Sequence, residues 1–459
     1  MPPFPPKPAL AILTFLAIAA VPNVLPPLKD YQLLQWRNTL AVLDFIPRKT
    51  SLSPVADEQL RLRPDVDASH YRVFPVNDAN NALGHFFEAL ERTERKQPGA
   101  LTRIVHYGDS PTTADMITGD ARVLLQQRYG DGGHGFSLIA KPWAWYEHRG
   151  VSLNARGWRI DPATQSQVRD GMFGLGGVSF YSPGDASTHF RLRDPDHTSV
   201  EVYFLKTRGG GNFSVFAGET KLGDVSTSAD STASGFAPFQ LPPGTRDVEV
   251  RSTGGGTVRL FGVTLSKPGP GVVYDSLGLN GAYVSVPARM FQEKHWAEQL
   301  RHRRPDLIII NYGTNESVYA KFIEQSYEKE LKEIIRRVRA SLPATSILVM
   351  SPMDRGQRDA SGDVTTNPAI TRLVHIQERI AAETRVAFFN TYQAMGGAGT
   401  MGRWYEAEPR LVGADFTHPM PAGAKLVGGL LHQALFDGYN KHKIRNMRAG
   451  LKTTERDKR

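Results

Sequence analysis

Residues 102–111 read Thr-Arg-Ile-Val-His-Tyr-Gly-Asp-Ser-Pro, and this stretch decides how the chain begins to fold. Its first six residues include β-branched and aromatic side chains, which favour a strand. Gly108 and Asp109 then indicate a turn, and Pro111 suits the first position of a helix, because its missing N–H has no helical partner there. The pattern predicts a strand at 102–107 and a helix at 112–128, with Ser110 where the two meet.

Strand and helix patterns also alternate in the second half of the chain. Residues 306–311 are a short apolar run bounded by turn residues, as expected for a parallel strand that is buried on both faces. Further strands are predicted at 346–351 and 386–390, and helices at 77–95, 324–341, 368–384 and 422–435. Such alternation favours an α/β domain with a parallel sheet covered by helices on both faces.

The intervening segment has a different pattern. Strand-like runs at 189–193, 199–205, 212–217, 247–252 and 257–266 are separated by turn signals such as the glycine triplets at 209–211 and 254–256. Long amphipathic helices are absent from this pattern. We therefore predict that residues 151–270 form an antiparallel β-sandwich domain, inserted between the two parts of the α/β domain at 77–150 and 271–439.

The two ends of the chain differ from its body. Residues 1–28 hold one lysine followed by a long apolar stretch, which predicts either a cleaved secretory signal or a membrane anchor, with a buried helix as the alternative. Residues 29–76 are predicted to be a linker. The tail at 440–459 has eight basic and two acidic residues, a net charge of +6 out of +9 for the whole chain, and is expected to be disordered and solvated.

Composition excludes several classes of function. The chain has no cysteine, so disulfides, thiolate catalysis and cysteine-based zinc sites are excluded. Because most of the net charge is in the tail, the folded body is not strongly basic, and no pattern typical of a nucleic-acid-binding module is present. The tail is a candidate for contact with anionic lipid or wall polymer. No metal-ligand or cofactor pattern is visible, and we predict neither.

Ser110 is the leading candidate nucleophile. A serine hydroxyl needs a base, the base needs an orienting acid, and the oxyanion needs donors directed at it. In Asp415-Phe-Thr-His418, the carboxylate is close enough along the chain to reach Nδ1–H of the imidazole, which would leave Nε2 free as a base. Taken singly, Ser110 and Asp415 also fit helix caps, and His418 fits a surface residue.

Two further turns hold candidate donors for an oxyanion. Gly313-Thr-Asn315-Glu316 follows the apolar strand at 306–311, and loops at the carboxyl ends of strands form the sites of open α/β sheets. Asn315 can donate from its side-chain amide. Gly281 offers an unobstructed backbone N–H, with Gly278 as its nearest rival. Each of these turns alone also fits a simple loop.

Taken together and in this order, the four motifs resemble blocks I, II, III and V of the SGNH, or GDSL-like, hydrolases, although Pro111 stands where the GDSL name expects Leu. The resemblance covers about residues 100–140 and 270–440 and implies a flavodoxin-like three-layer domain. It implies that Ser110, His418 and Asp415 form a catalytic triad. It also implies an oxyanion hole made by the N–H groups of Ser110 and Gly281 and by the amide of Asn315.

The segments at 129–136 and 395–397, with Trp404, further resemble the extracytoplasmic SGNH enzymes that remove O-acetyl groups from peptidoglycan and carry a carbohydrate-module-like insertion. Asp109, His134 and Trp143 are additional candidates for contacts with the triad or with substrate, although packing between the two domains is the alternative for Trp143 and surface exposure for His134.

Three functions are compatible with these motifs. The first is an extracytoplasmic serine esterase that removes O-acyl groups, expected to be O-acetyl groups, from a polysaccharide such as peptidoglycan. The second is an O-acyltransferase, since the same triad forms the same acyl-enzyme and only the acceptor differs. The third is an inactive glycan-binding protein. A membrane contact through residues 1–28 is compatible with each of them.

Overall fold

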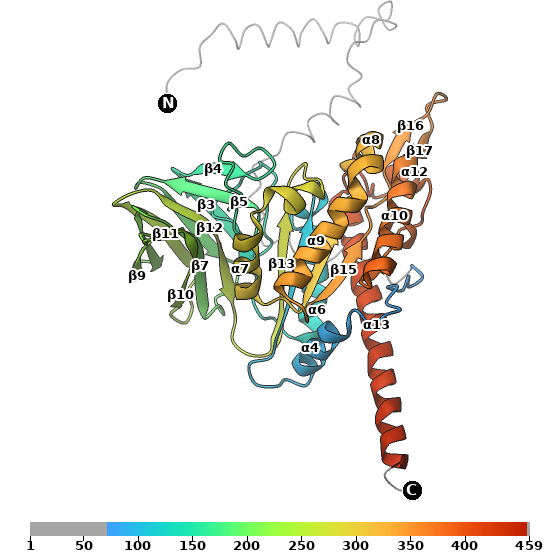
Figure 1. The fold of residues 1–459 in the computed structure, drawn as a ribbon, viewed down its shortest axis with the longest axis horizontal. Helices are drawn as coiled ribbons and strands as arrows, with labels where there is room; N and C mark the ends of the chain where they lie inside the picture. The colour runs from blue at the N-terminus through green and yellow to red at the C-terminus, as the bar shows by residue number, and fades with distance from the viewer. Residues whose placement is uncertain (1–70, 457–459) are drawn as a thin grey trace, which may run out of the picture. The chain divides into compact units, whose positions relative to one another are not determined.

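The computed structural model describes residues 71–456, which belong to one compact unit. Its centre is a parallel sheet in the order β13-β1-β14-β15-β18 (Figure 1). The strands are β1 Leu101–Gly108, β13 Gly271–Gly278, β14 Leu307–Asn311, β15 Ser346–Met350 and β18 Ala387–Phe389. Every neighbouring pair is parallel. The predicted α/β fold with a parallel sheet is therefore confirmed.

Helices cover both faces of this sheet, because side chains of each strand point alternately to opposite faces. In β14, Ile308 and Ile310 pack on one side with α7, α9 and α10, whereas Leu307 and Ile309 pack on the other side with α4, α6 and α13. These helices are α4 Gly84–Glu94, α6 Ile117–Tyr129, α7 Glu293–Arg303, α9 Glu328–Ser341, α10 Pro368–Thr384 and α13 Pro421–Arg456. Figure 1 shows α9 in front of β13 and β15.

Shorter elements connect these layers. They are α5 Ser110–Thr113, η3 Val286–Met290, η4 Glu316–Val318, α8 Ala320–Phe322, η5 Ile323–Tyr327, α11 Thr391–Ala394 and α12 Thr400–Glu406, with a small hairpin of β16 Gly356–Arg358 and β17 Val364–Thr366. Most of them follow the carboxyl ends of the parallel strands, where α8 and the β16–β17 hairpin are seen at the top of Figure 1.

Two antiparallel sheets form a sandwich beside the parallel sheet. One has the order β10-β7-β12-β5-β4, with β2 also paired to β12, and the other has the order β3-β6-β11-β8-β9. The first consists of β2 Gly135–Ser137, β4 Arg159–Pro162, β5 Val178–Ser182, β7 Ser199–Lys206, β10 Ala233–Gln240 and β12 Val258–Ser266. The second consists of β3 Val151–Arg156, β6 Ser187–Leu192, β8 Asn212–Ala217, β9 Thr220–Ser226 and β11 Asp247–Gly254. Phe204 and Phe213 meet between the sheets, with ring centroids 5.4 Å apart.

The sandwich and the α/β region share buried contacts. Asp275 on β13 accepts hydrogen bonds from Arg303 on α7 and, at 2.8 Å, from the backbone N–H of Phe136 on β2. All three residues are nearly fully buried. Strand β2 belongs to a sandwich sheet, although it precedes the expected domain boundary at residue 150. The division at 150 and 270 stays a prediction.

The helix predicted at 112–128 is interrupted. It is split into α5 and α6 at Asp115, which adopts a left-handed backbone with φ of +50°. The buried carboxylate of Asp115 accepts hydrogen bonds from the Arg122 guanidinium at 2.6 and 3.1 Å and from the Arg149 backbone N–H at 2.9 Å. These charge-assisted bonds offset the cost of breaking the helix and tie α6 to the segment before β3.

The expectation of a disordered tail was wrong. Helix α13 continues through the basic segment to Arg456, about six turns beyond the predicted end at residue 435. Glu94 on α4 accepts hydrogen bonds from Tyr439 at 2.6 Å and Lys443 at 3.0 Å, which hold this extension against the body. No proline interrupts residues 422–456, so the helical hydrogen-bond pattern of the backbone can continue through them.

Two other expectations concern the N-terminal part. The predicted helix at 77–95 is shorter, because α4 begins only at Gly84, after a turn in which Asp78 accepts a hydrogen bond from the Ala82 backbone N–H. The leader predicted at 1–28 and the linker up to residue 70 lie outside the described residues. Between residues 71 and 456, no helix is both long and apolar enough to span a bilayer.

Candidate active site

Ser110 is the first residue of α5 and directly follows the carboxyl end of β1. The turn depends on two glycines paired across the ends of β1 and β13, Gly108 and Gly278. A Cβ atom on Gly108 would lie 2.2 Å from Thr112 Oγ1, and one on Gly278 would lie 2.4 Å from the Thr113 backbone nitrogen. The glycines therefore allow α5 to pack across the strand ends and present Ser110 at the surface of the sheet edge.

The structure brings His418 to Ser110 from 308 residues away. Ser110 Oγ and His418 Nε2 are 2.8 Å apart, and His418 Nδ1 is 2.5 Å from Asp415 Oδ2. Because a carboxylate only accepts hydrogen bonds, the Nδ1 atom carries the proton, and Nε2 of the neutral ring accepts from the serine hydroxyl. Ser110, His418 and Asp415 thus form one hydrogen-bonded chain in the order that a serine nucleophile requires.

The turn before α13 holds this pair in place. Asp415 Oδ1 accepts the backbone N–H groups of Thr417 and His418, each at 3.1 Å. Phe416 has a left-handed backbone, with φ of +52°, and its side chain is buried. Burial raises the pKa of Asp415, but the hydrogen bonds from His418 and the backbone outweigh it and lower the pKa to about 2. The hydrogen bond that His418 donates to the Asp415 carboxylate raises the pKa of His418.

The candidate oxyanion donors follow three adjacent strands. Gly281 follows β13, Ser110 follows β1 and Asn315 follows β14, and these three strands neighbour one another with their ends level at the Gly108–Gly278 and Gly108–Asn311 pairs. Asn315 Nδ2 donates to the Ala282 carbonyl oxygen at 2.9 Å, which joins the first and third loops. An amide nitrogen has two hydrogens, so the second N–H remains for an incoming oxygen atom.

Two buried carboxyl groups lie beneath these loops. Asp109 precedes the candidate nucleophile, and burial raises its pKa to about 7. Glu316 is 0% exposed, burial raises its pKa to about 8, and its Oε1 accepts the Val284 backbone N–H at 2.7 Å. In the part of the chain that the structure describes, Asp109 Oδ2 and Glu316 Oε2 have no hydrogen-bond partner. Glu316 was not singled out from the sequence, although it belongs to the Gly-Thr-Asn-Glu motif.

Arg355 is a second residue that sequence reasoning missed. Its Nη1 donates to the Thr314 carbonyl oxygen at 3.1 Å and to Ser317 Oγ at 3.0 Å, on either side of Asn315. Its positive charge also acts to lower the pKa of His418, against the larger effect of Asp415. No local signal around Arg355 marks it, because it reaches this loop from the segment after β15.

The other sequence candidates lie in packed surroundings. His134 is buried rather than exposed, and its Nε2 lies 3.1 Å from the Gly150 carbonyl oxygen, next to the rings of His148 and His197. Trp143 is half-buried against a hydrophobic cluster that includes side chains of both the sandwich and the α/β region. None of the contacts found for His134 or Trp143 involves the triad. Among the described side chains, no three His, Asp or Glu residues are placed to hold a metal ion.

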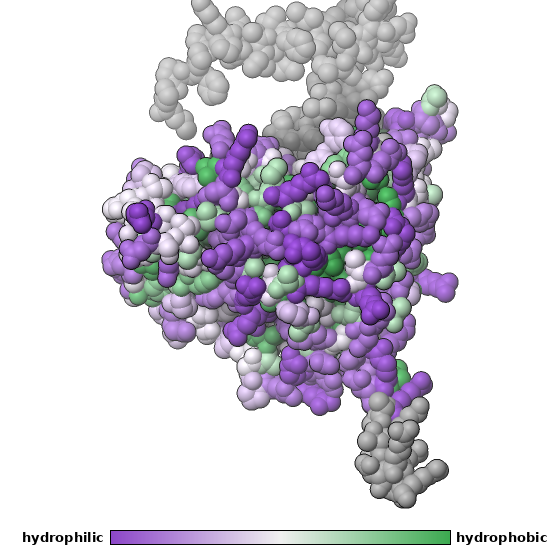
Figure 2. Space-filling view, in the orientation of Figure 1, coloured by the Kyte–Doolittle hydropathy of each residue, from purple (hydrophilic) through white to green (hydrophobic). Residues whose placement is uncertain are grey.

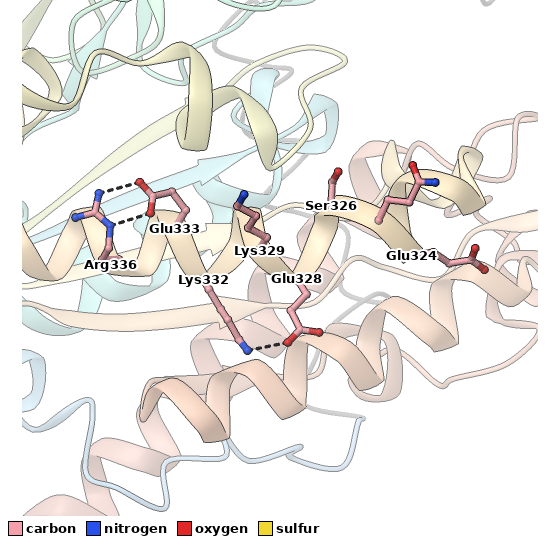
Figure 3. A pocket seen from close by; sticks show the side chains of 8 residues that line it. Glu324, Ser326, Glu328, Lys329, Lys332, Glu333 and Arg336 are labelled. Atoms are coloured by element: carbon pink, nitrogen blue, oxygen red, sulfur yellow. Dashed lines mark hydrogen bonds and ion pairs between the residues drawn. The ribbon is translucent and has the colours of Figure 1, made fainter.

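A groove of about 590 Å³ runs along α9 but does not contain the triad (Figure 3). Charged side chains that form ion pairs line this groove, including Lys332 with Glu328 at 2.7 Å and Arg336 with Glu333 at 2.8 Å. The hydrophilic side chains at the middle of the face in Figure 2 belong to this region. Such exposed pairs are typical of a solvated helix surface, so we place the candidate site at the strand ends instead.

Part of the chain, which includes most of the candidate site residues, matches a known protein family. Residues 230–426 match the model of the GDSL-like Lipase/Acylhydrolase family. This stretch of the chain is therefore similar to the GDSL-like hydrolases. The matched stretch contains Gly281, Asn315, Asp415 and His418 and leaves out Ser110, which precedes the β-rich segment.

The molecule is similar to several solved structures. One described as "Peptidoglycan O-acetylesterase in action, 5 min" has a TM-score of 0.69 and 22% sequence identity, covering 80% of this chain and 99% of that chain. A putative GDSL-like lipase from Parabacteroides merdae and a carbohydrate acetylesterase from Sinorhizobium meliloti each cover 36% of this chain, and 73% and 79% of their own chains, at 18% and 16% identity and TM-scores of 0.28. No curated protein matches the sequence. The family match supports an ester hydrolase, and the likeness to the first structure shows that the fold is shared over 80% of this chain.

Proposed function

We propose that this hydrolase removes O-acetyl groups from a carbohydrate polymer outside the cytoplasm, with Ser110 as nucleophile, His418 as base and Asp415 as the acid that orients the base. The observation that carries the proposal is the continuous hydrogen-bonded chain from Ser110 Oγ through His418 to Asp415. A helix cap or a surface histidine alone would not require all three groups to meet.

In the first half of the reaction, His418 Nε2 accepts the hydroxyl proton as Ser110 Oγ attacks the acyl carbonyl carbon. Negative charge then develops on the carbonyl oxygen, while Asp415 stabilises the imidazolium. The N–H groups of Ser110, Gly281 and Asn315 would donate to this oxygen, and such donors are effective because their position is set before charge develops.

In the second half, the tetrahedral intermediate collapses and the ester C–O bond breaks. The imidazolium of His418 gives its proton to the leaving sugar hydroxyl, which leaves acetyl on Ser110. A water molecule, deprotonated by His418, then attacks the acyl-enzyme. Acetate leaves and the Ser110 hydroxyl is restored, so no co-reactant other than water is consumed.

Several observations support a polymeric substrate. The side chains of His418 and Asp415 are 51% and 47% exposed, so the triad lies at an open surface, not inside a closed cavity. Tyr319, close to Asn315 in the sequence, is 57% exposed, and an exposed aromatic ring can pack against a sugar ring. The likeness, over 80% of this chain, to a structure described as a peptidoglycan O-acetylesterase favours an acetylated wall glycan.

The location outside the cytoplasm is proposed from the sequence of residues 1–28, whose single lysine and apolar stretch suit a secretory signal or anchor. Cell fractionation of the full chain tests it. Recovery of the protein in the cytoplasmic fraction with residues 1–28 intact would contradict the location without affecting the chemistry.

The activity is tested with a chromogenic acetyl ester and with O-acetylated peptidoglycan. We expect Ser110→Ala to lower kcat/KM on both by about 10⁴-fold or more, since the nucleophile is lost. Ser231→Ala, an exposed serine in the sandwich, is the matched control and should leave both unchanged. Wild-type turnover no faster than that of Ser110→Ala would refute the proposal. Acetyl recovered on a glycan hydroxyl, in place of free acetate, would show transfer, not hydrolysis.

A further inference from the structure

A groove of about 310 Å³ lies at the open edge of the sandwich, outside the candidate active site. Strand β3 is the outer strand of one sheet and β4 is the outer strand of the other, and the two are joined by a turn at Gly157. The groove is lined by Ala140, Lys141, Leu153, Asn154, Ala155, Arg156, Gly157, Trp158 and Ile160. It therefore lies where, among the strands that the structure describes, each sheet has its outermost strand.

The position of Trp158 in this groove is set by hydrogen bonds. Its Nε1–H donates to Thr188 Oγ1 at 2.9 Å, and Thr188 Oγ1 in turn donates to the Ile139 carbonyl oxygen at 2.8 Å. The ring is half-buried against the sandwich core. An aromatic ring held in one orientation loses little conformational entropy when the apolar face of a sugar ring packs against it.

The polar lining of the groove holds the guanidinium of Arg156 and the ammonium of Lys141, which is paired with Glu147. Lys141, Asn154 and Arg156 are exposed, and among the described residues no Asp or Glu contributes to the lining. Arg156 donates from Nε to Ser187 Oγ at 3.1 Å, and among the ion pairs of residues 71–456 none involves Arg156. A planar amide and a guanidinium beside an aromatic ring suit sugar hydroxyls together with a carboxylate substituent.

The groove is connected to the nucleophile by a short series of contacts. Lys141 Nζ is 2.6 Å from Glu147 Oε1, and the Glu147 backbone N–H donates to the carbonyl oxygen of Thr113, the last residue of α5. Trp145, on the same connecting segment, is 51% exposed. In Figure 1, β3 and β4 lie in the upper part of the view, as do α8 and the β16–β17 hairpin that follow the carboxyl ends of the parallel strands.

We propose that this groove binds a stretch of an acidic polysaccharide while another sugar of the same strand presents its ester to Ser110. The inference rests on the proposed function, and it adds a carboxylate-bearing glycan strand as the class of substrate. Two linked contacts on one polymer raise the effective concentration of the ester at the triad. The groove should therefore affect KM for polymer but leave the chemistry at Ser110 unchanged.

The test compares polymer with a small ester in the full-length protein. Arg156→Glu reverses an exposed charge in the groove, and we expect it to raise KM for O-acetylated peptidoglycan by about tenfold or more while kcat and the turnover of a chromogenic acetyl ester stay unchanged. Arg156→Lys keeps the positive charge, so its KM for O-acetylated peptidoglycan should stay close to that of wild type. Arg208→Glu, the same change on an exposed arginine in the β7–β8 turn, is the matched control and should alter neither substrate.

A second variant and a binding assay separate this inference from the proposed function. Trp158→Ala should raise the polymer KM in the same way. In the Ser110→Ala background, binding of de-O-acetylated peptidoglycan should weaken with Arg156→Glu and with added salt. This binding assay remains informative even if wild-type protein hydrolyses no ester, which would refute the function alone. Polymer KM and binding within twofold of wild type in both groove variants would overturn the inference, as would equally tight binding of polyglutamate.

Discussion

Glu316 should behave as a neutral acid that supports the oxyanion loop, and replacement by Gln tests this directly. The side chain is fully buried, with one oxygen bound to the Val284 backbone N–H and the other without a partner in the described structure. Because burial raises its pKa to about 8, the folded protein holds the proton more tightly than the unfolded chain does. The group is thus about nine-tenths protonated at pH 7.

The sign of the pH dependence follows from this difference. With a carboxyl pKa raised in the folded state, stability is highest below the ordinary pKa of 4.5 and falls as the pH rises towards about 8. One pKa unit corresponds to about 1.4 kcal/mol. The free energy of unfolding therefore falls by less than about 1 kcal/mol at pH 5 and by at most about 4 kcal/mol at pH 8, relative to low pH. Glutamine keeps an oxygen that can accept from Val284 and cannot ionise, so Glu316→Gln should avoid this loss.

Chemical denaturation at the two pH values measures the effect. We expect Glu316→Gln to match wild type at pH 5 and to be more stable by up to about 4 kcal/mol at pH 8, with kcat on an acetyl ester retained. Glu316→Ala leaves the Val284 N–H buried and unpaired, which costs about 1–3 kcal/mol at both pH values and should lower kcat by loosening the segment after Gly281. Glu219→Gln, at an exposed position, is the control for a generic change of charge.

A Glu316→Gln protein that is less stable than wild type at pH 8 would refute a protonated Glu316 in the folded protein. That result would mean that the carboxylate is ionised and paired in the folded protein. An equal gain at pH 5 and pH 8 would also refute it, because the stabilisation would then come from packing and not from the avoided ionisation.

Two further predictions concern the loops around the triad. Asn315→Ala removes the amide that donates to the Ala282 carbonyl and is available to an oxyanion, so we expect kcat to fall by about 10²–10³-fold with little change in KM; an unchanged kcat would exclude this role. Arg355→Gln removes a positive charge that lowers the pKa of His418, so the acid limb of the pH profile of kcat/KM should move to higher pH. Arg355→Lys should leave the limb in place, and a shift to lower pH in Arg355→Gln would contradict the assigned sign.

Much of the α/β architecture was predictable because it depends on local patterns. The all-apolar run of β14 is what burial on both faces of a sheet requires, and the helix predicted at 368–384 coincides with α10, which begins at Pro368 after the cap Asn367. Several sandwich strands were not predicted, among them β3, β4, β9 and β10. Strand β3 does alternate, over six residues only, whereas glycine, proline or polar residues interrupt the alternation of β4, β9 and β10. Long-range pairing decides where such strands form.

Departures from prediction occurred where distant residues supply the stabilising contact. The break between α5 and α6 is stabilised by the bonds of Asp115 to Arg122 and Arg149, and only the first of these is near in sequence. The extension of α13 is held by Glu94, more than 300 residues before it. A pattern read along one segment contains no information about such partners.

The sequence by itself determined the strand-to-helix turn at Ser110 and the spacing that lets Asp415 reach His418. It also determined the order along the chain of the loops that follow the parallel strands. These features follow from backbone preferences and from distances of a few residues. Only the tertiary structure decided that His418 meets Ser110, that Glu316 is buried beneath the oxyanion loop and that Arg355 lies beside the triad. The reason is physical: parallel strands bring their carboxyl ends to one edge, so residues far apart in sequence meet there, and their burial and electrostatic surroundings arise only from that packing.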